Sequence, residues 1–213
     1  MYDLVFLFLH IQIDIQMGAD LSSPITDEYQ QGFDGPRLTA ASVSMHGSRF
    51  SMEDRTSFLP MWDRSNAPKE ETTRCQEWES PLPELAEYSS FFGIYDGHCG
   101  QRTSHALTTA LPKTMNLLSA VDIHDLTRKP EPGVRQCLDL DQEFLKDHIL
   151  QGDSSGSTAV WAMVNEKDSS VVLGNLGDSR ALILRYDRET GRLSGDQPLN
   201  DHKPEDAAES KLI

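Results

Sequence analysis

Residues 91–98 read Phe-Phe-Gly-Ile-Tyr-Asp-Gly-His, an apolar and aromatic run that ends in a carboxylate and a glycine. From residue 89 to residue 95 the pattern is typical of a strand that is buried on both faces. Burying this strand brings Asp96 into a region of low dielectric, where its carboxylate needs a counter-charge. Gly97 lets the backbone bend, so that its carbonyl can face a metal ion or a water bound to it.

A second acidic motif lies upstream of this strand and reads Arg49-Phe50-Ser51-Met52-Glu53-Asp54. Strands are expected at residues 38–45 and 56–62, so the motif occupies a strand junction that holds its side chains rigidly. Hard divalent cations prefer oxygen ligands, and a two-metal site needs several carboxylates. Glu53 and Asp54 are therefore candidates beside Asp96, although an isolated Glu-Asp pair is usually a solvated turn. Arg49 offers paired donors that match a phosphate group.

The rest of the chain alternates between helical and strand patterns. Helices are expected at residues 103–118, where Pro112 weakens the pattern, and at 134–150, where Val134, Leu138, Leu145 and Ile149 recur at helical spacing. Strands are expected at 156–165, 170–176 and 179–186, followed by a hairpin turn at 187–191. Residues 66–87 are expected to form a surface loop. Strands interrupted by two consecutive helices predict an α+β sandwich.

Composition and charge exclude several classes of partner. A chain of 213 residues with 38% hydrophobic and 25% charged residues can form one sizeable soluble domain, and we expect a monomer. The net charge of −15 argues against nucleic acid and anionic membranes. No apolar stretch approaches the roughly 20 residues that cross a bilayer. The three cysteines form no C-x-x-C pair, which indicates reduced thiols and a cytoplasmic or nuclear location.

Five short motifs share their order with one known family. They are Arg49 through Asp54, Asp96-Gly97-His98, Ser155 through Ala159, Gly177-Asp178-Ser179-Arg180 and Asp201-His202-Lys203-Pro204. Each is weak alone, but the ordered set resembles the PPM (PP2C-like) metal-dependent protein serine/threonine phosphatases. The resemblance implies an antiparallel β-sandwich flanked by helices. It also implies Mg²⁺ or Mn²⁺ as cofactor, with two ions and a weaker third, and phosphorylated proteins as substrates.

The resemblance also assigns roles to individual residues. Asp96 would bridge the two ions, with Glu53 on one ion and the Gly97 carbonyl on the other. Asp54 would lie in the surrounding shell, and Asp178 would help to hold the third ion. His98 would donate a proton to the leaving alkoxide, as an imidazole that titrates near neutrality can do.

The implied reaction is hydrolysis of a phosphomonoester by a water that the metal ions activate, while Arg49 holds the phosphoryl oxygens. Two rival phosphatase mechanisms lack their residues. A cysteine-dependent enzyme needs an Arg six positions after its Cys. Here Cys99 is followed at that position by His105, Cys75 by Pro81 and Cys137 by Glu143. An aspartyl-phosphate enzyme needs D-x-D-x-[TV], and residues 139–143 fail at the last position.

The two ends of the chain depart from the pattern of this family. Residues 1–16 are expected to be a non-native or variant extension, because the family start resembles the sequence from Met17, with residues 17–36 as an N-terminal segment. A start at Met17 would place Gly18 and Ser22 in a myristoylation pattern, which would give only weak membrane association. Residues 37–213 are expected to be a partial phosphatase domain, truncated at its C-terminus.

The truncation leaves alternatives to an active enzyme. The family takes further metal-binding aspartates from the region after this one, so we expect the chain as given to be inactive or poorly folded. It could then be an inactive fragment, or a non-catalytic module that binds phosphopeptides through Arg49. A simple acidic binder of divalent ions is a third possibility.

Overall fold

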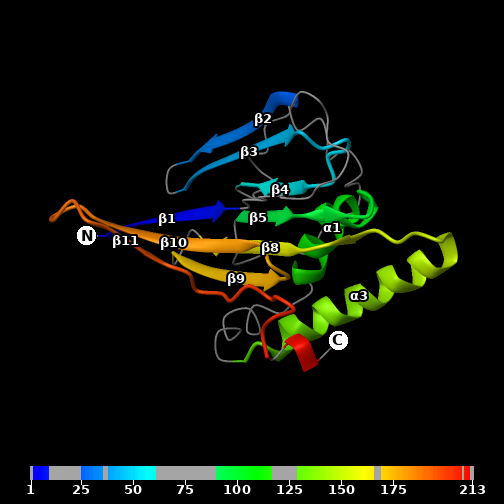
Figure 1. Cartoon of the computed structure of the whole chain (residues 1–213). Helices are drawn as coiled ribbons and strands as arrows, with labels where there is room; N and C mark the ends of the chain where they lie inside the picture. Colours follow the sequence, from blue (N-terminus) through cyan, green and yellow to red (C-terminus); the bar gives the residue numbers. More distant parts are fainter. Residues whose placement is uncertain are drawn as a thin grey trace.

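The structure is a computed structural model that describes residues 2–9, 25–35, 38–60, 90–116, 129–165, 169–207 and 209–211. Within these ranges the fold is α+β, with antiparallel sheets and two α-helices (Figure 1). This confirms the predicted fold class. The predicted loop at 66–87 lies outside the described residues.

A four-stranded antiparallel sheet forms the centre of the fold. Its order is β4 (Arg55–Leu59), β5 (Ser90–Tyr95), β8 (Ala159–Asn165) and β9 (Ser170–Leu176). Strand β5 pairs with β4 on one side and with β8 on the other, so Phe92 lies opposite both Phe58 and Ala162. Every residue of β8 is buried, and β5 is buried at Phe91 and Tyr95. Strand β5 is thus an inner strand as predicted, but only one of its faces is fully buried, since Phe92 and Ile94 on the other face are half-buried.

Helix α1 (Arg102–Asn116) lies against β4 and β5, and helix α3 (Glu131–Gln151) lies against α1 (Figure 1). Pro112 stands inside α1 and cannot donate to the carbonyl of Thr108, one turn earlier. The hydroxyl of Ser57, on β4, donates to that carbonyl at 2.9 Å instead. The lost helical hydrogen bond is thereby replaced, which explains why the helix continues through the proline.

The core forms between the sheet and α1, around the fully buried Tyr95, Leu111 and Met115 together with Trp161 and Met163. Helix α3 adds Leu140 to this core, with Cys137 and Phe144 packed against it. The apolar residues that predicted α3 lie elsewhere: Val134, Leu138 and Leu145 are exposed. Their spacing predicted the helix correctly, but they are not its core face.

The remaining strands form smaller antiparallel sheets. β2 (Ile25–Asp34) pairs with β3 (Thr39–Gly47), and β10 (Arg180–Asp187) pairs with both β1 (Tyr2–Leu9) and β11 (Leu193–Asp196). A two-residue pair joins β6 (Gly97–His98) to β7 (Gly156–Ser157), and a 3₁₀ turn covers Glu209–Lys211. The predicted hairpin turn between β10 and β11 is confirmed, with Asp187 Oδ1 accepting from the Glu189 amide at 2.9 Å. No helix in the described ranges is long and apolar enough to cross a membrane.

Replacing Leu111 with Ala should lower the free energy of unfolding by about 2–5 kcal/mol, because the side chain is 1% exposed and its loss leaves a cavity. Leu138→Ala is the matched control, since Leu138 is 56% exposed and its loss should change stability by less than about 0.5 kcal/mol. Urea denaturation of both variants measures the difference. Equal losses would show that α1 does not cover the core as described.

Alkaline pH should destabilise the fold. Burial raises the pKa of the Cys137 thiol to about 11, and burial also raises the pKa of Tyr95, against a smaller opposite effect of its hydrogen bond with Ser57. Both folded-state pKa values lie above the ordinary ones, so the folded state keeps protons that the unfolded state loses first. The free energy of unfolding should therefore fall as the pH rises through 9 to 11, the interval between the ordinary and the raised pKa of Cys137.

Denaturation midpoints between pH 8 and pH 11 measure this fall. Cys137→Ala should make the decline shallower, whereas Cys99→Ala, which changes an exposed cysteine, should keep the wild-type slope. An unchanged slope in Cys137→Ala would contradict the assignment to this thiol.

Candidate functional site

The candidate site is built on the turn that leaves β5. Tyr95, the last residue of the strand, is completely buried, and its hydroxyl lies 2.9 Å from the hydroxyl of Ser57. Asp96 follows it directly and is half-buried. The Asp96 carbonyl accepts from the amide of Thr158 at 2.9 Å, and the Asp96 amide donates to the Thr158 hydroxyl at 3.4 Å. Thr158 therefore makes hydrogen bonds with both backbone groups of Asp96, its amide and its carbonyl.

Gly97 brings the Glu53 backbone against this turn. A Cβ atom on Gly97 would collide with the carbonyl oxygen of Glu53 and would lie 2.7 Å from the hydroxyl of Ser104. Ser104 is fully buried, and its hydroxyl donates to the Glu53 carbonyl and lies 3.1 Å from the Gln101 carbonyl. Only a glycine permits this close approach. Two of the acidic residues predicted from sequence, Glu53 and Asp96, are thus carried by backbone segments in direct contact.

Arg55 holds the rest of the 49–54 connection, a role that the sequence reasoning missed. Its guanidinium donates to the carbonyls of Met52 at 2.8 Å and Asp54 at 2.6 Å, and also to the side chain of Gln101. An Arg can do this because its five donors form a rigid fork. The only signal in the sequence was its place directly after the acidic motif.

The two predicted catalytic side chains belong to the same region of the chain. Arg49 lies between β3 and β4, in the connection that also carries Glu53, and is half-buried. His98 ends β6 and is exposed, and a Cβ atom on Gly156 would collide with its ring. The pairing of β6 with β7 therefore requires a glycine at 156, which accounts for that residue in the Ser155 through Ala159 motif.

The predicted third-metal residue, Asp178, is exposed and lies in the turn between β9 and β10. Gly177 has a φ of +94°, which glycine adopts freely. Next to it, Ser179 is buried, and its hydroxyl lies 2.6 Å from that of Thr158. This turn is therefore tied to the same threonine as the Asp96 turn.

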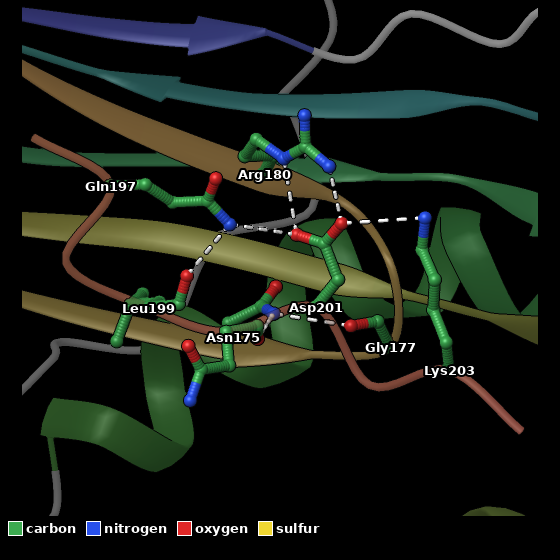
Figure 2. Close-up of polar contacts among 8 residues, drawn as sticks. Asn175, Gly177, Arg180, Gln197, Leu199, Asp201 and Lys203 are labelled. Carbon is green, nitrogen blue, oxygen red and sulfur yellow. Dashed lines mark hydrogen bonds and ion pairs between the residues drawn. The ribbon is translucent and has the colours of Figure 1, made fainter. Parts of the chain in front are cut away.

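A network around Asp201 holds the other side of the Asp178 turn (Figure 2). The Asp201 carboxylate accepts from Arg180 Nε at 3.1 Å and from Gln197 Nε2 at 3.1 Å, and Lys203 Nζ lies 3.5 Å away. The hydrogen bond from Arg180 is the main cause that lowers the pKa of Asp201, so this carboxylate stays charged. The sequence reasoning used Asp201 only as a family motif and did not predict this role.

The segment of Asp201 is also attached to the turn through its backbone. The His202 amide donates to the Gly177 carbonyl at 2.9 Å, and Asn175 Nδ2 donates to the same carbonyl at 3.1 Å and to the Asn200 carbonyl at 3.0 Å. The turn that carries Asp178 is therefore held by contacts with residues more than twenty positions later in the chain.

The predicted metal ligands do not converge into one cluster. Within the part of the chain that the structure describes, no three His, Cys, Asp or Glu side chains lie close enough together to hold a metal ion. Glu53 Oε1 accepts from the Ser51 hydroxyl at 3.0 Å, and Asp178 is exposed on a separate turn, between β9 and β10. The structure brings together the backbone of Glu53, Asp96 and Gly97, but not the full predicted set with Asp54 and Asp178.

This smaller set still matches a hard cation in its chemistry. Carboxylate and carbonyl oxygens are the donors that Mg²⁺ and Mn²⁺ prefer. Mg²⁺ commonly binds through one or two carboxylates while it keeps several waters. The oxygen donors of Glu53, Asp96 and the Gly97 carbonyl are therefore of the chemical type that suits such an ion.

Comparison with known proteins gives one consistent match. Residues 38–213 match the family model described as protein phosphatase 2C. The chain is 29% identical over 199 residues to a probable protein phosphatase 2C of Caenorhabditis elegans and 29% identical over 199 residues to protein phosphatase 2C homolog 2 of Schizosaccharomyces pombe. Each alignment covers 92% of this chain and 46% of the relative.

Protein phosphatase 1L of Bos taurus is 27% identical over 194 residues, which cover 87% of this chain and 45% of that protein. The chain thus spans less than half the length of these curated relatives. Because the match reaches from residue 38 to residue 213, it includes every site residue discussed above.

Gly97→Ala should destabilise the fold by about 1–3 kcal/mol, because the added methyl group must displace the Glu53 carbonyl or Ser104. Gly32→Ala in β2 is the control, since a Cβ atom there meets nothing within 4 Å. Urea denaturation should show a loss in the first variant and none in the second. A Gly97→Ala variant as stable as the wild type would refute the close approach.

Proposed function

Because the chain belongs to the protein phosphatase 2C family, we propose that it is a metal-dependent protein serine/threonine phosphatase. Its substrates would be phosphoserine and phosphothreonine in proteins. The observation that supports this most directly is the junction at Gly97, where the strand-end turn of Asp96 meets the connection that carries Arg49 and Glu53. Carboxylates at such a junction, together with an arginine that can bind phosphate, suit hydrolysis of a phosphomonoester.

The proposed cofactor is Mg²⁺ or Mn²⁺, with two ions at the main site. The Glu53 and Asp96 carboxylates and the Gly97 carbonyl would hold them, with Asp54 in the surrounding shell. Asp178 would contribute to a weaker third site. When bound, such ions supply a hydroxide at neutral pH by lowering the pKa of a coordinated water. The contribution of this chain is to hold these oxygens at the end of a buried strand, where Tyr95 and Thr158 restrict their movement.

Arg49 and His98 would act on the phosphate ester itself. The Arg49 guanidinium would bind and orient the phosphoryl oxygens, because its donors match them in pairs and its charge persists at working pH. His98 would hold a proton at an imidazole nitrogen for the leaving alkoxide of the serine or threonine. Its exposed position next to Gly156 leaves the ring accessible to a protein substrate.

A second candidate function is a non-catalytic module that binds phosphopeptides. The described residues gather no group of three metal-ligating side chains, and this observation favours a chain that binds a phosphate group without hydrolysing it. Arg49 would then be the main contact with the phosphate.

Hydrolysis of a phosphothreonine peptide in the presence of Mn²⁺ tests the proposal. If this chain is the proposed enzyme, it should release phosphate, and Asp96→Asn should reduce the rate about 100-fold or more, because metal ions stabilise such transition states by several kcal/mol. Asp141→Asn is the charge-matched control, since Asp141 is exposed on α3 away from the Asp96 turn, and it should retain the wild-type rate.

Binding of the same peptide without hydrolysis separates the two candidates. A peptide that binds and is not hydrolysed with Mn²⁺, and whose binding is lost in Arg49→Ala, would overturn the enzyme in favour of the binding module. Hydrolysis that persists unchanged in Asp96→Asn would contradict both the proposed metal ligand and the proposed mechanism.

A further inference from the structure

Thr158 lies at the break between β7 and β8, where the chain passes from the small sheet into the central one. The two-residue strand β7 pairs with β6 directly after Asp96, and β8 begins at Ala159. Thr158 therefore lies opposite the Asp96 turn. Its amide donates to the Asp96 carbonyl at 2.9 Å, and its hydroxyl accepts from the Asp96 amide at 3.4 Å.

The same hydroxyl has a second partner from a distant part of the chain. Ser179 is 2% exposed, and its hydroxyl lies 2.6 Å from Thr158 Oγ1. A hydroxyl group has one donor and two acceptor sites, so Thr158 can accept from Asp96 and donate to Ser179 at the same time. The two hydrogen bonds join residues that are far apart in sequence, one directly after β5 and one directly before β10.

The methyl group of Thr158 makes an independent contact with the second turn. A Cβ atom on Gly177 would lie 2.7 Å from Thr158 Cγ2, so the methyl group occupies the space that a side chain at 177 would need. Both branches of the threonine therefore face the turn that carries Asp178. From the other side, the Gly177 carbonyl accepts from the amide of His202. Figure 2 shows Arg180 bound to Asp201 beside this turn.

We propose that Thr158 is a positioning residue that couples the Asp96 turn to the Asp178 turn through its hydroxyl. The inference rests on the proposed function, in which these two turns carry metal ligands. Displacement of one turn changes the position of the other, because the shared hydroxyl cannot keep both hydrogen bonds if the turns separate. The ligand geometry at Asp96 thus depends on a serine that follows Asp178.

Three substitutions separate the parts of this contact. Thr158→Val keeps the shape and removes the hydroxyl, Thr158→Ser keeps the hydroxyl and removes the methyl group, and Ser179→Ala removes only the second partner. Thr108→Val is the matched control, because the Thr108 hydroxyl donates to the His105 carbonyl in its own helix at 2.7 Å and contacts neither turn. Circular dichroism and thermal unfolding establish that each variant of the full chain is folded.

The first measurement is amide hydrogen exchange of the metal-free chain at residues 177–179. Thr158→Val should accelerate exchange there about fivefold, the factor that corresponds to the loss of one net hydrogen bond, and Ser179→Ala should accelerate exchange at Asp96 and Gly97. Thr158→Ser and Thr108→Val should leave both turns close to wild type. The effects of Thr158→Val and Ser179→Ala should not add in the double variant, since they remove the same interaction.

The second measurement is Mn²⁺ affinity by titration calorimetry. Thr158→Val should weaken binding about 10-fold to 100-fold, as the loss of a group that orients a metal ligand typically does, and Thr158→Ser should bind nearly as the wild type does. A variant that is merely less stable, such as Thr108→Val, should keep the wild-type affinity.

The outcomes distinguish this inference from the proposed function. If Asp96→Asn abolishes Mn²⁺ binding while Thr158→Val changes neither affinity nor exchange at 177–179, the coupling is wrong and the proposed function stands. If no form binds Mn²⁺, the proposed metal dependence fails, and the exchange data alone decide the coupling. If Thr108→Val accelerates amide exchange at both turns as much as Thr158→Val does, the inference is overturned, because a general loss of stability then explains the result.

Discussion

The close approach of Gly97 to the carbonyl of Glu53 is the contact on which the candidate site depends. It joins the end of β5, an inner strand of the four-stranded sheet, to the connection between β3 and β4, two segments more than forty residues apart in sequence. The buried Ser104 stabilises the contact by donating to the same carbonyl, and Tyr95 fixes the strand end by its complete burial. A side chain at position 97 would separate these segments, and the acidic residues on them with it. The antiparallel pairing of β4 with β5, which sets Arg55 opposite Tyr95, brings these segments side by side, and the glycine permits their close approach.

Side-chain hydroxyls complete the backbone hydrogen bonding at two places where regular elements of this fold are interrupted. Ser57 satisfies the carbonyl that Pro112 leaves without a helical donor, and Thr158 contacts both backbone groups of Asp96 at a break between strands. A backbone N–H or C=O group that is buried without a hydrogen-bond partner lowers the stability of the fold. In this molecule the hydrogen bonds of these hydroxyls also connect separate elements. Ser57 links β4 to α1, and Thr158 together with Ser179 links two turns. The polar residues near the site are therefore part of its support.

Most of the elements could be predicted from sequence because their patterns are local. The apolar run that became β5, the turn at residues 187–191 and both helices lie where the sequence placed them. The orientation of α3 could not be predicted, because Val134 and Leu138 recur at helical spacing yet are exposed, while Leu140 packs into the core. Periodicity identifies a helix, but the neighbouring elements select the face that is buried. For the same reason the pairing of Tyr2–Leu9 with β10 was not foreseen, since a strand partner is a long-range choice.

The sequence by itself determined the family, through an order of motifs that belongs to protein phosphatase 2C, and the chemical character of the candidate site, which has carboxylates at strand ends and an arginine suited to phosphate. Residue type and order carry that information without a fold. Only the tertiary structure decided which of these residues meet. It placed the backbone of Glu53 against Gly97, kept Asp178 on a separate turn, and assigned supporting roles to Arg55, Thr158 and Asp201. These roles arise from hydrogen bonds between distant segments, and such contacts exist only once the chain has folded.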